Sequence, residues 1–222
     1  MRIHRLAFCS IGPYNEPQEI DFEQLNDAKV FLFSGPTGAG KSTILDAITL
    51  ALYGYPAASR GQSVSAMVSN TADLIANPPT VELEISTKDG RFRIHRTLQH
   101  AVPSKRAAAG FATRQSKGLL ERFDGQNYTP VSTSLAEIGA EITNLMHLTR
   151  EQFTTVMMLP QGQFAGFLSA TTKDRRVILQ QLFGTHRFDQ VIAHLKDQAD
   201  QAVAEHQEQL TIMDQKERSI KS

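Results

Sequence analysis

The sequence predicts an α/β domain that carries an antiparallel β subdomain and ends in one long helix. Three observations support this fold class. An apolar run at residues 30–34 leads into a glycine-rich turn and then an amphipathic helix. Pairs of short alternating segments are joined by turn sequences, as at residues 88–90. Residues 186–222 contain neither glycine nor proline, which is typical of an uninterrupted helix.

Composition excludes several classes of protein. The 222 residues, 41% of them hydrophobic, are enough for one large domain with a buried core. Cys9 is the single cysteine, so the chain has no internal disulfide and no cysteine-based zinc site. The seven histidines lack metal-ligand spacing. No secretory h-region is present, and the most apolar later stretch, residues 44–53, is too short to span a bilayer. We therefore expect a cytoplasmic protein without membrane contact.

Local patterns predict the individual elements. Apolar or alternating segments bounded by turn residues predict strands at residues 3–8, 19–22, 30–34, 81–86, 92–97, 119–123, 128–131 and 156–159. Because the run at 30–34 has no polar face, we expect it to be buried on both sides. Apolar spacing and capping residues predict helices at 41–53, 134–145, 149–154, 173–183 and 186–222. Residues 55–79 are expected to form a loop, and residues 101–117 a flexible excursion.

The last helix allows two interpretations. A 4-3 repeat that starts at Phe188 is apolar at seven of ten positions, which favours the start of a coiled coil. A solvated surface helix is the alternative. We divide the chain into a domain at 1–185 and the start of a coiled-coil helix at 186–222. Because such a helix has little of its own domain to pack on, we expect the natural chain to continue beyond Ser222.

The glycine-rich turn carries the strongest signal for function. Residues 35–42 read G-P-T-G-A-G-K-S, which matches G-x-x-x-x-G-K-S/T at every fixed position. Its glycines allow successive N–H groups to face one concavity, at the positive end of the following helix dipole. Lys41 would reach the β- and γ-phosphates, Ser42 a bridging Mg²⁺, and Thr43 the α-phosphate side. The predicted nucleotide-binding residues are Gly35, Pro36, Thr37, Gly38, Ala39, Gly40, Lys41, Ser42 and Thr43.

Three classes of P-loop NTPase are compatible with such a loop. A GTPase is disfavoured because no Asp has a Gly three residues later and no guanine-reading N/T-K-x-D sequence is present. A small nucleotide kinase stays a minor alternative, because hairpin-like strands follow the loop helix. An ATPase of the ATP-binding-cassette type fits the antiparallel strands on both sides of the loop. It also fits Gln161, which follows a short predicted strand and would bind Mg²⁺ and orient the attacking water.

The chain resembles the N-terminal lobe of the SbcC family, the ATPase subunits of bacterial SbcCD DNA-end nucleases within the SMC-like group. The likeness lies in Leu6-Ala7-Phe8, Gly12-Pro13-Tyr14, Ile20-Asp21-Phe22, the loop at 35–43 with residues 45–48 and 52–54, the segment Leu159-Pro160-Gln161-Gly162-Gln163-Phe164-Ala165-Gly166-Phe167-Leu168, and the predicted helical segment at 175–185. The segment around Gln161 is its most specific part, since the phosphate loop is shared with many families.

The resemblance implies an ABC-type head that binds ATP and Mg²⁺, with Lys41 and Gln161 as catalytic residues. Its implied partners are the C-terminal lobe of the same ATPase, a second head joined by ATP, an SbcD-type nuclease subunit and double-stranded DNA, in a nucleoid-associated complex. Walker B, signature and switch-histidine residues would lie in the C-terminal lobe, and none is found here. We therefore expect the isolated chain to bind ATP weakly and to hydrolyse it negligibly. The alternative is a DNA-tethering head of the SMC or recombination-mediator type, without a nuclease partner.

A basic window suggests a place for DNA. Between residues 91 and 122 there are eight Lys or Arg and one acidic residue, a local net charge of +7 in a chain whose net charge is zero. A basic excursion beside a strand pair can follow a phosphate backbone. The predicted DNA contacts are Arg60, Lys105, Arg106, Arg114 and Lys117. Pairing of these charges with a missing lobe is the equally open alternative.

Overall fold

The computed structural model describes residues 1–26, 30–57, 63–105, 110–154, 171–172 and 186–220. The chain divides into two compact units, Met1–Gln161 and Gly162–Ser222. The first unit contains the strands and the glycine-rich turn. The second contains the long helix. The predicted strand at 156–159 and the predicted helix at 173–183 lie outside the described residues, and the predicted domain boundary at residue 185 stays a prediction.

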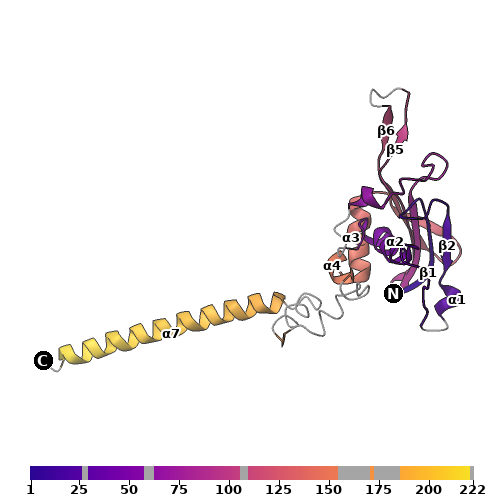
Figure 1. Ribbon diagram of the computed structural model, residues 1–222. Helices are drawn as coiled ribbons and strands as arrows, with labels where there is room; N and C mark the ends of the chain where they lie inside the picture. Colours follow the sequence, from indigo (N-terminus) through magenta and orange to yellow (C-terminus); the bar gives the residue numbers. More distant parts are fainter. Residues whose placement is uncertain (27–29, 58–62, 106–109, 155–170, 173–185, 221–222) are drawn as a thin grey trace. The chain divides into compact units, whose positions relative to one another are not determined.

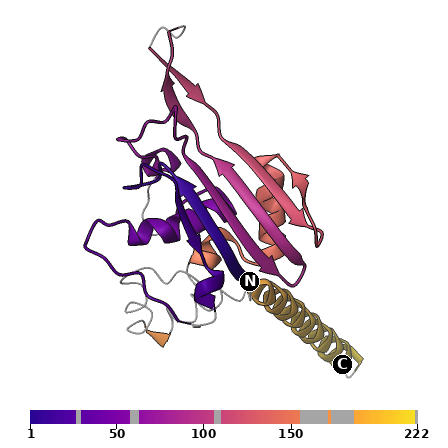
Figure 2. The same cartoon turned by 90° about the vertical axis from the view of Figure 1, so that its right-hand side faces the viewer.

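An antiparallel six-stranded sheet, in the order β2-β1-β3-β4-β7-β8, forms the frame of the first unit (Figure 2). Its strands are β1 (Arg2–Cys9), β2 (Gln18–Asp21), β3 (Thr80–Thr87), β4 (Gly90–Thr97), β7 (Lys117–Phe123) and β8 (Tyr128–Ser132). A separate pair, β5 (His100–Pro103) with β6 (Phe111–Arg114), extends from one end. The sheet confirms six of the predicted strands.

Four of the described helices confirm predicted helices, and two short ones, at residues 23–26 and 64–67, were not predicted. They are α1 (Glu23–Asn26), α2 (Lys41–Tyr53), η2 (Val64–Met67), α3 (Leu135–Met146), α4 (Arg150–Phe153) and α7 (His186–Ile220). The Ser134 side chain accepts a hydrogen bond from the Glu137 N–H, and Thr149 forms a full capping box with Gln152. Helix α2 has the predicted bounds and ends at Gly54, whose left-handed conformation lets its N–H donate to Leu50 O.

Helices α2 and α3 cover one face of the sheet (Figure 1). Side chains alternate along the strands, so every second residue faces these helices. The inward residues include Leu6, Leu83, Ile85, Ile94 and Leu120, all fully buried. They pack in one core with Leu50 and Leu52 of α2 and with Ile138 and Ile142 of α3. This core fixes α2, and therefore the turn before it, against the sheet.

Arg96 attaches the end of helix α2 to strand β4. It lies on the inward face of β4, where its guanidinium donates from Nε to Ala51 O at 2.7 Å and from Nη2 to Leu52 O at 3.0 Å. Burial lowers the pKa of Arg96 to about 10, so it remains a cation at neutral pH. A cation that binds the last carbonyls of a helix also opposes the negative end of its dipole.

The structure corrects two expectations. Residues 30–34 form no strand, and Val30 and Leu32 are 83% and 87% exposed. A run without a polar face needs strands beside it, and the described part of the chain offers it no pairing strand. The expected flexible excursion at 101–117 is in part a β-hairpin, since β5 and β6 pair from His100–Arg114 to Pro103–Phe111. Residues 106–109 lie outside the description.

Helix α7 is continuous, as the absence of glycine and proline predicts. Its apolar side chains Val191, Ile192 and Leu195 are 55–61% exposed. The coiled coil stays a prediction. Among the described helices, including α7, none combines enough length and apolar character to cross a bilayer.

Candidate functional site

The glycine-rich turn leads into the first residues of α2 and is exposed. Lys41, the first residue of α2, extends back over the loop, and its Nζ donates to Gly35 O and Pro36 O, both at 2.7 Å. The Ala39 N–H donates to Pro36 O at 3.2 Å, which closes a turn. The ammonium group therefore lies against the residues where the chain enters the loop.

The N-terminus of α2 can accept an anion. No side chain caps it, because its N-cap residue is Gly40, and its first turn has no acidic residue. The first N–H groups of a helix lack partners within the helix, and the helix dipole adds partial positive charge there. Residues 34–39 and Ser42 are exposed. These features fit the phosphates of a nucleotide, with Lys41 as counter-ion and the Ser42 hydroxyl free to coordinate Mg²⁺.

Thr43 has a different environment from Ser42. Its side chain is 7% exposed and lies against the backbone of Gly12, where an added Cβ would be 2.8 Å from Thr43 Cγ2. Packing of the Thr43 side chain therefore also joins the helix to the turn after β1. Its predicted contact near the α-phosphate stays a prediction.

Several predicted site residues lie outside the described part of the chain. These are Gln161, Arg60 and Arg106. Their roles toward Mg²⁺ and DNA remain predictions. Within the described ranges, no group of three or more His, Cys, Asp or Glu side chains could hold a metal ion. The predicted magnesium site, made by Ser42 and Gln161 together with phosphate oxygens, is not a cluster of that kind.

Two arginines of the basic window are paired with one carboxylate on the outer face of the sheet. Arg91 Nη2 donates to Glu84 at 2.9 Å, and Arg93 donates to the other oxygen of the same carboxylate at 2.9 Å. Arg93 also lies 3.7 Å from the centre of the Tyr128 ring. The Arg122 Nη2 donates to Asp89 O at 2.9 Å. Together with Arg96, four of the eight basic residues donate hydrogen bonds within the domain, and Arg91 and Arg93 are paired with Glu84, so the +7 count overstates the charge available to a partner.

The carboxylates responsible were missed by the sequence window because they precede it. Glu84 lies on β3 directly opposite Arg93 of β4, and Glu82 lies opposite His95. The signal was present in the pairing of the two predicted hairpin strands, since residues opposite each other share a face. The inward position of Arg96 could have been predicted from alternation along β4, because Arg96 follows Phe92 and Ile94 at every second residue.

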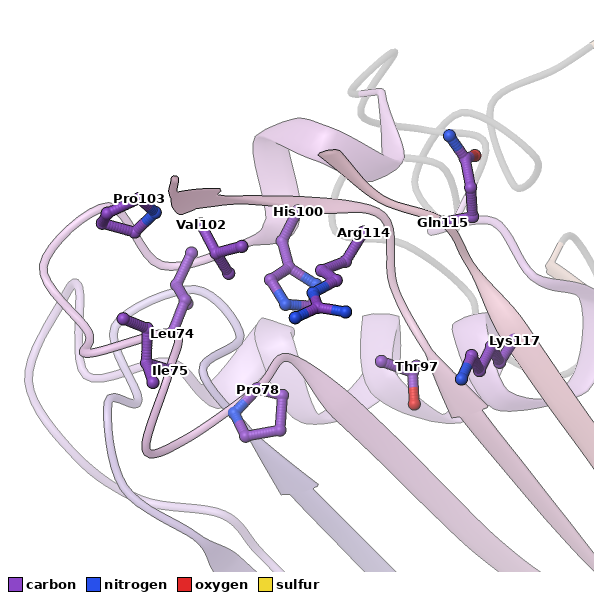
Figure 3. A pocket seen from close by; sticks show the side chains of 10 residues that line it. All are labelled: Leu74, Ile75, Pro78, Thr97, His100, Val102, Pro103, Arg114, Gln115 and Lys117. Atoms are coloured by element: carbon purple, nitrogen blue, oxygen red, sulfur yellow. The ribbon is translucent and has the colours of Figure 1, made fainter. Parts of the chain in front are cut away.

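Arg114 and Lys117 line a hollow of about 470 Å³ at the base of the β5–β6 hairpin (Figure 3). The buried His100 lies in the same wall, with its Nδ1 2.8 Å from Leu98 O, and Figure 3 shows its ring beside the Arg114 guanidinium. Among the residues that the structure describes, none of those lining this hollow carries a carboxylate. Arg114, Lys117 and the nearby Lys105 are exposed. These three are the predicted DNA contacts that the structure describes, and their role stays a prediction.

The fold and the loop together define a class of protein. A family model described as an AAA domain matches residues 5–222, so the chain belongs to this family of ATPase domains. The mixed helical and antiparallel architecture around the phosphate loop fits a P-loop NTPase.

Similar curated proteins narrow the likeness. The SbcC subunit of nuclease SbcCD from Lactococcus lactis is 34% identical over 80% of this chain and 17% of that protein. The proteins of the same name from Vibrio cholerae and Bacillus subtilis are 33% and 34% identical over 90% and 92% of the chain. The resemblance to SbcC predicted from the sequence is confirmed. The chain spans less than a fifth of the length of these relatives.

Proposed function

We propose that this chain is the ATP-binding lobe of an SMC-like ATPase head that works with a nuclease subunit on DNA ends and hairpins. The exposed phosphate loop carries the proposal, because it offers an uncapped helix N-terminus and a lysine whose ammonium contacts Gly35 at the start of the loop. The relatives are named as part of nuclease SbcCD, which supports the nuclease partner.

In this proposal the loop amides and Lys41 hold the triphosphate of ATP. When ATP binds, the Lys41 ammonium donates to phosphate oxygens in place of Gly35 O and Pro36 O. Phosphate oxygens are charged and therefore stronger acceptors than carbonyl oxygens. Ser42 and Gln161 hold Mg²⁺, which neutralises charge on the β- and γ-phosphates when bound. Gln161 also orients the attacking water. The general base and the trans-acting signature loop come from the C-terminal lobe, so the isolated chain hydrolyses ATP negligibly.

The exposed run at residues 30–33 supports a missing lobe of the ABC type. Phe31 lies between Phe22 and Phe33, with ring centroids 5.8 Å and 5.4 Å apart, yet Phe31 is 43% exposed. Contiguous exposed apolar residues mark an interaction surface. The C-terminal lobe supplies the strands that cover this run, α7 starts the coiled coil that connects the two lobes, and ATP joins two such heads.

Double-stranded DNA is the proposed partner of the hairpin surface. Arg114 and Lys117 supply positive charge to a hollow whose described lining has no carboxylate, and Lys105 follows β5 of the same hairpin. Such contacts bind phosphates without reading bases. Arg60 and Arg106 are further candidates. The cytoplasmic, nucleoid-associated location expected from the sequence belongs to the same proposal.

Co-purification of the full-length protein tests this function. We expect it to bring down a dimetal phosphoesterase and to hydrolyse ATP, while the chain of residues 1–222 alone hydrolyses ATP negligibly. Rapid turnover by the isolated chain would contradict the missing-lobe account. A full-length protein that binds DNA and ATP but no nuclease would instead favour the DNA-tethering head.

A further inference from the structure

The turn at residues 12–14, between β1 and β2, packs directly against the phosphate loop. A Cβ on Gly40 would lie 2.8 Å from Tyr14 Cζ and 2.8 Å from Pro13 Cγ. Only glycine permits this approach, because real Cβ atoms do not come so close to ring atoms. The last glycine of the loop is therefore fixed by its contact with Tyr14 as well as by its left-handed φ of 86°.

The Tyr14 hydroxyl orients one peptide unit of the loop. It donates to Ala39 O at 3.1 Å. The peptide between Ala39 and Gly40 is planar and trans, so its C=O and N–H groups point in opposite directions. By holding the carbonyl on the side of the turn, Tyr14 directs the Gly40 N–H away from the turn. The phosphate loop binds through such N–H groups.

Tyr14 is itself held by the frame of the domain. Its ring meets Phe8 of β1 edge to face, with centroids 5.0 Å apart and planes at 83°. The Tyr14 N–H donates to Ile11 O at 3.1 Å, and the Gly12 N–H donates to Met67 O at 2.8 Å. Ile11 is fully buried in the core. A rigid sheet therefore carries the side chain that touches the loop.

We propose that Tyr14 is a positioning residue that preorganises the phosphate loop for its ligand. A loop rich in glycine loses much conformational freedom when it closes on a phosphate. A contact that holds the loop in its binding shape before the ligand arrives removes part of that loss and raises affinity. This inference rests on the proposed nucleotide binding and adds a residue outside the G-x-x-x-x-G-K-S/T sequence.

The test compares three variants in a head reassembled from this chain and the C-terminal lobe. Tyr14→Phe keeps the ring and removes the hydrogen bond to Ala39. Tyr14→Leu removes both. The control is Phe123→Leu, which breaks an aromatic pair with Tyr128 of similar separation, 5.1 Å, at the other edge of the sheet. Calorimetry with Mg·ADP measures affinity, and steady-state kinetics separates KM from kcat for ATP.

We expect Tyr14→Leu to weaken Mg·ADP binding about 10-fold, which corresponds to about 1.4 kcal/mol for the ring contact and the hydrogen bond together. Tyr14→Phe should weaken it about 3-fold or less, because the ring is retained, and amide exchange should quicken at residues 39–41. Phe123→Leu should bind like the wild type. The expected kinetic effect is on KM, since preorganisation of the loop favours bound nucleotide before the chemical step.

Wild-type affinity in a folded Tyr14→Leu head would overturn the inference. So would equal losses in Tyr14→Leu and Phe123→Leu, because both would then reflect general destabilisation. If Tyr14→Leu does not fold, unchanged amide exchange at residues 39–41 in Tyr14→Phe overturns it instead. A Lys41→Ala head that binds Mg·ADP normally would refute the nucleotide site itself, which is a separate failure.

Discussion

The phosphate loop and the basic window were both predicted as binding regions, but their groups have different environments in the structure. The loop is built from backbone groups, and residues 34–39 are exposed. The window is built from side chains, and Arg91 and Arg93 meet the buried carboxylate of Glu84. The loop offers the backbone of an uncapped helix start to a ligand. In the basic window, Arg91 and Arg93 are already paired with a carboxylate of the same domain.

The difference shows which kind of sequence pattern reliably predicts a binding region in the folded protein. A phosphate loop depends on neighbours in sequence, because its geometry comes from glycines and a helix start within eight residues. A charge count over a window ignores the strand paired with it. Here β3 lies beside β4 in an antiparallel register that places Glu84 opposite Arg93. Net charge in a β region therefore has to be counted across strands.

Substitution of two loop glycines gives the largest expected effect and separates backbone strain from side-chain contact. Gly38 and Gly40 both have φ of 86°, but only Gly40 has atoms within 4 Å of an added Cβ. We expect Gly40→Ala to weaken nucleotide binding about 100-fold, and Gly38→Ala about 10-fold, from strain of about 1–3 kcal/mol. Calorimetry on the reassembled head measures both. Equal losses would show that contact with the turn is unimportant.

Arg96→Met should lower the free energy of unfolding by about 2–3 kcal/mol, because Ala51 O and Leu52 O lose a buried charged donor. Urea denaturation of the reassembled head measures this. Arg2→Met is the control, since the Arg2–Glu23 pair is 53% and 43% exposed and contributes about 1 kcal/mol or less. A loss for Arg96→Met no larger than for Arg2→Met would contradict its role in anchoring α2.

Neutralising the hairpin surface tests the remaining basic residues. A head with Lys105→Gln, Arg114→Gln and Lys117→Gln should bind double-stranded DNA about 10-fold more weakly. Its salt slope should fall by about 0.9 for each phosphate that is no longer neutralised. Arg93→Gln, whose cation is already paired with Glu84, should change neither quantity. If the triple variant keeps its affinity and salt slope, DNA binds elsewhere.

Acid should weaken the sheet through Glu82. Hydrogen bonding from His95, then from Arg5, lowers the pKa of Glu82 from 4.5 to about 2. A carboxylate with a depressed pKa stabilises the fold above pH 4.5, and this contribution is lost as the pH falls toward 2. Because Glu82 is partly solvated, about 1 kcal/mol is expected. Glu82→Gln should flatten the stability profile between these values, and a profile parallel to the wild type would refute this.

Local rules sufficed for elements whose stability comes from nearby residues. The bounds of α2 and the Ser134 cap were predicted from sequence neighbours, whereas the Thr149 capping box at the start of α4 was not. Prediction failed where the conformation of a segment depends on contacts with residues far away in the sequence. The run at 30–34 is apolar enough for a buried strand, but no described strand pairs with it. The contact between Tyr14 and Gly40 joins residues 26 positions apart, and no pattern along the chain reveals it.

Calorimetric titration of the reassembled head with Mg·ATP analogues that resist hydrolysis tests the central claim most directly. We predict a saturable heat for the wild type and none for Lys41→Ala, whose missing ammonium is the one that bridges Gly35 and Pro36. Superimposable isotherms for the two proteins, or no heat from either, would contradict the claim.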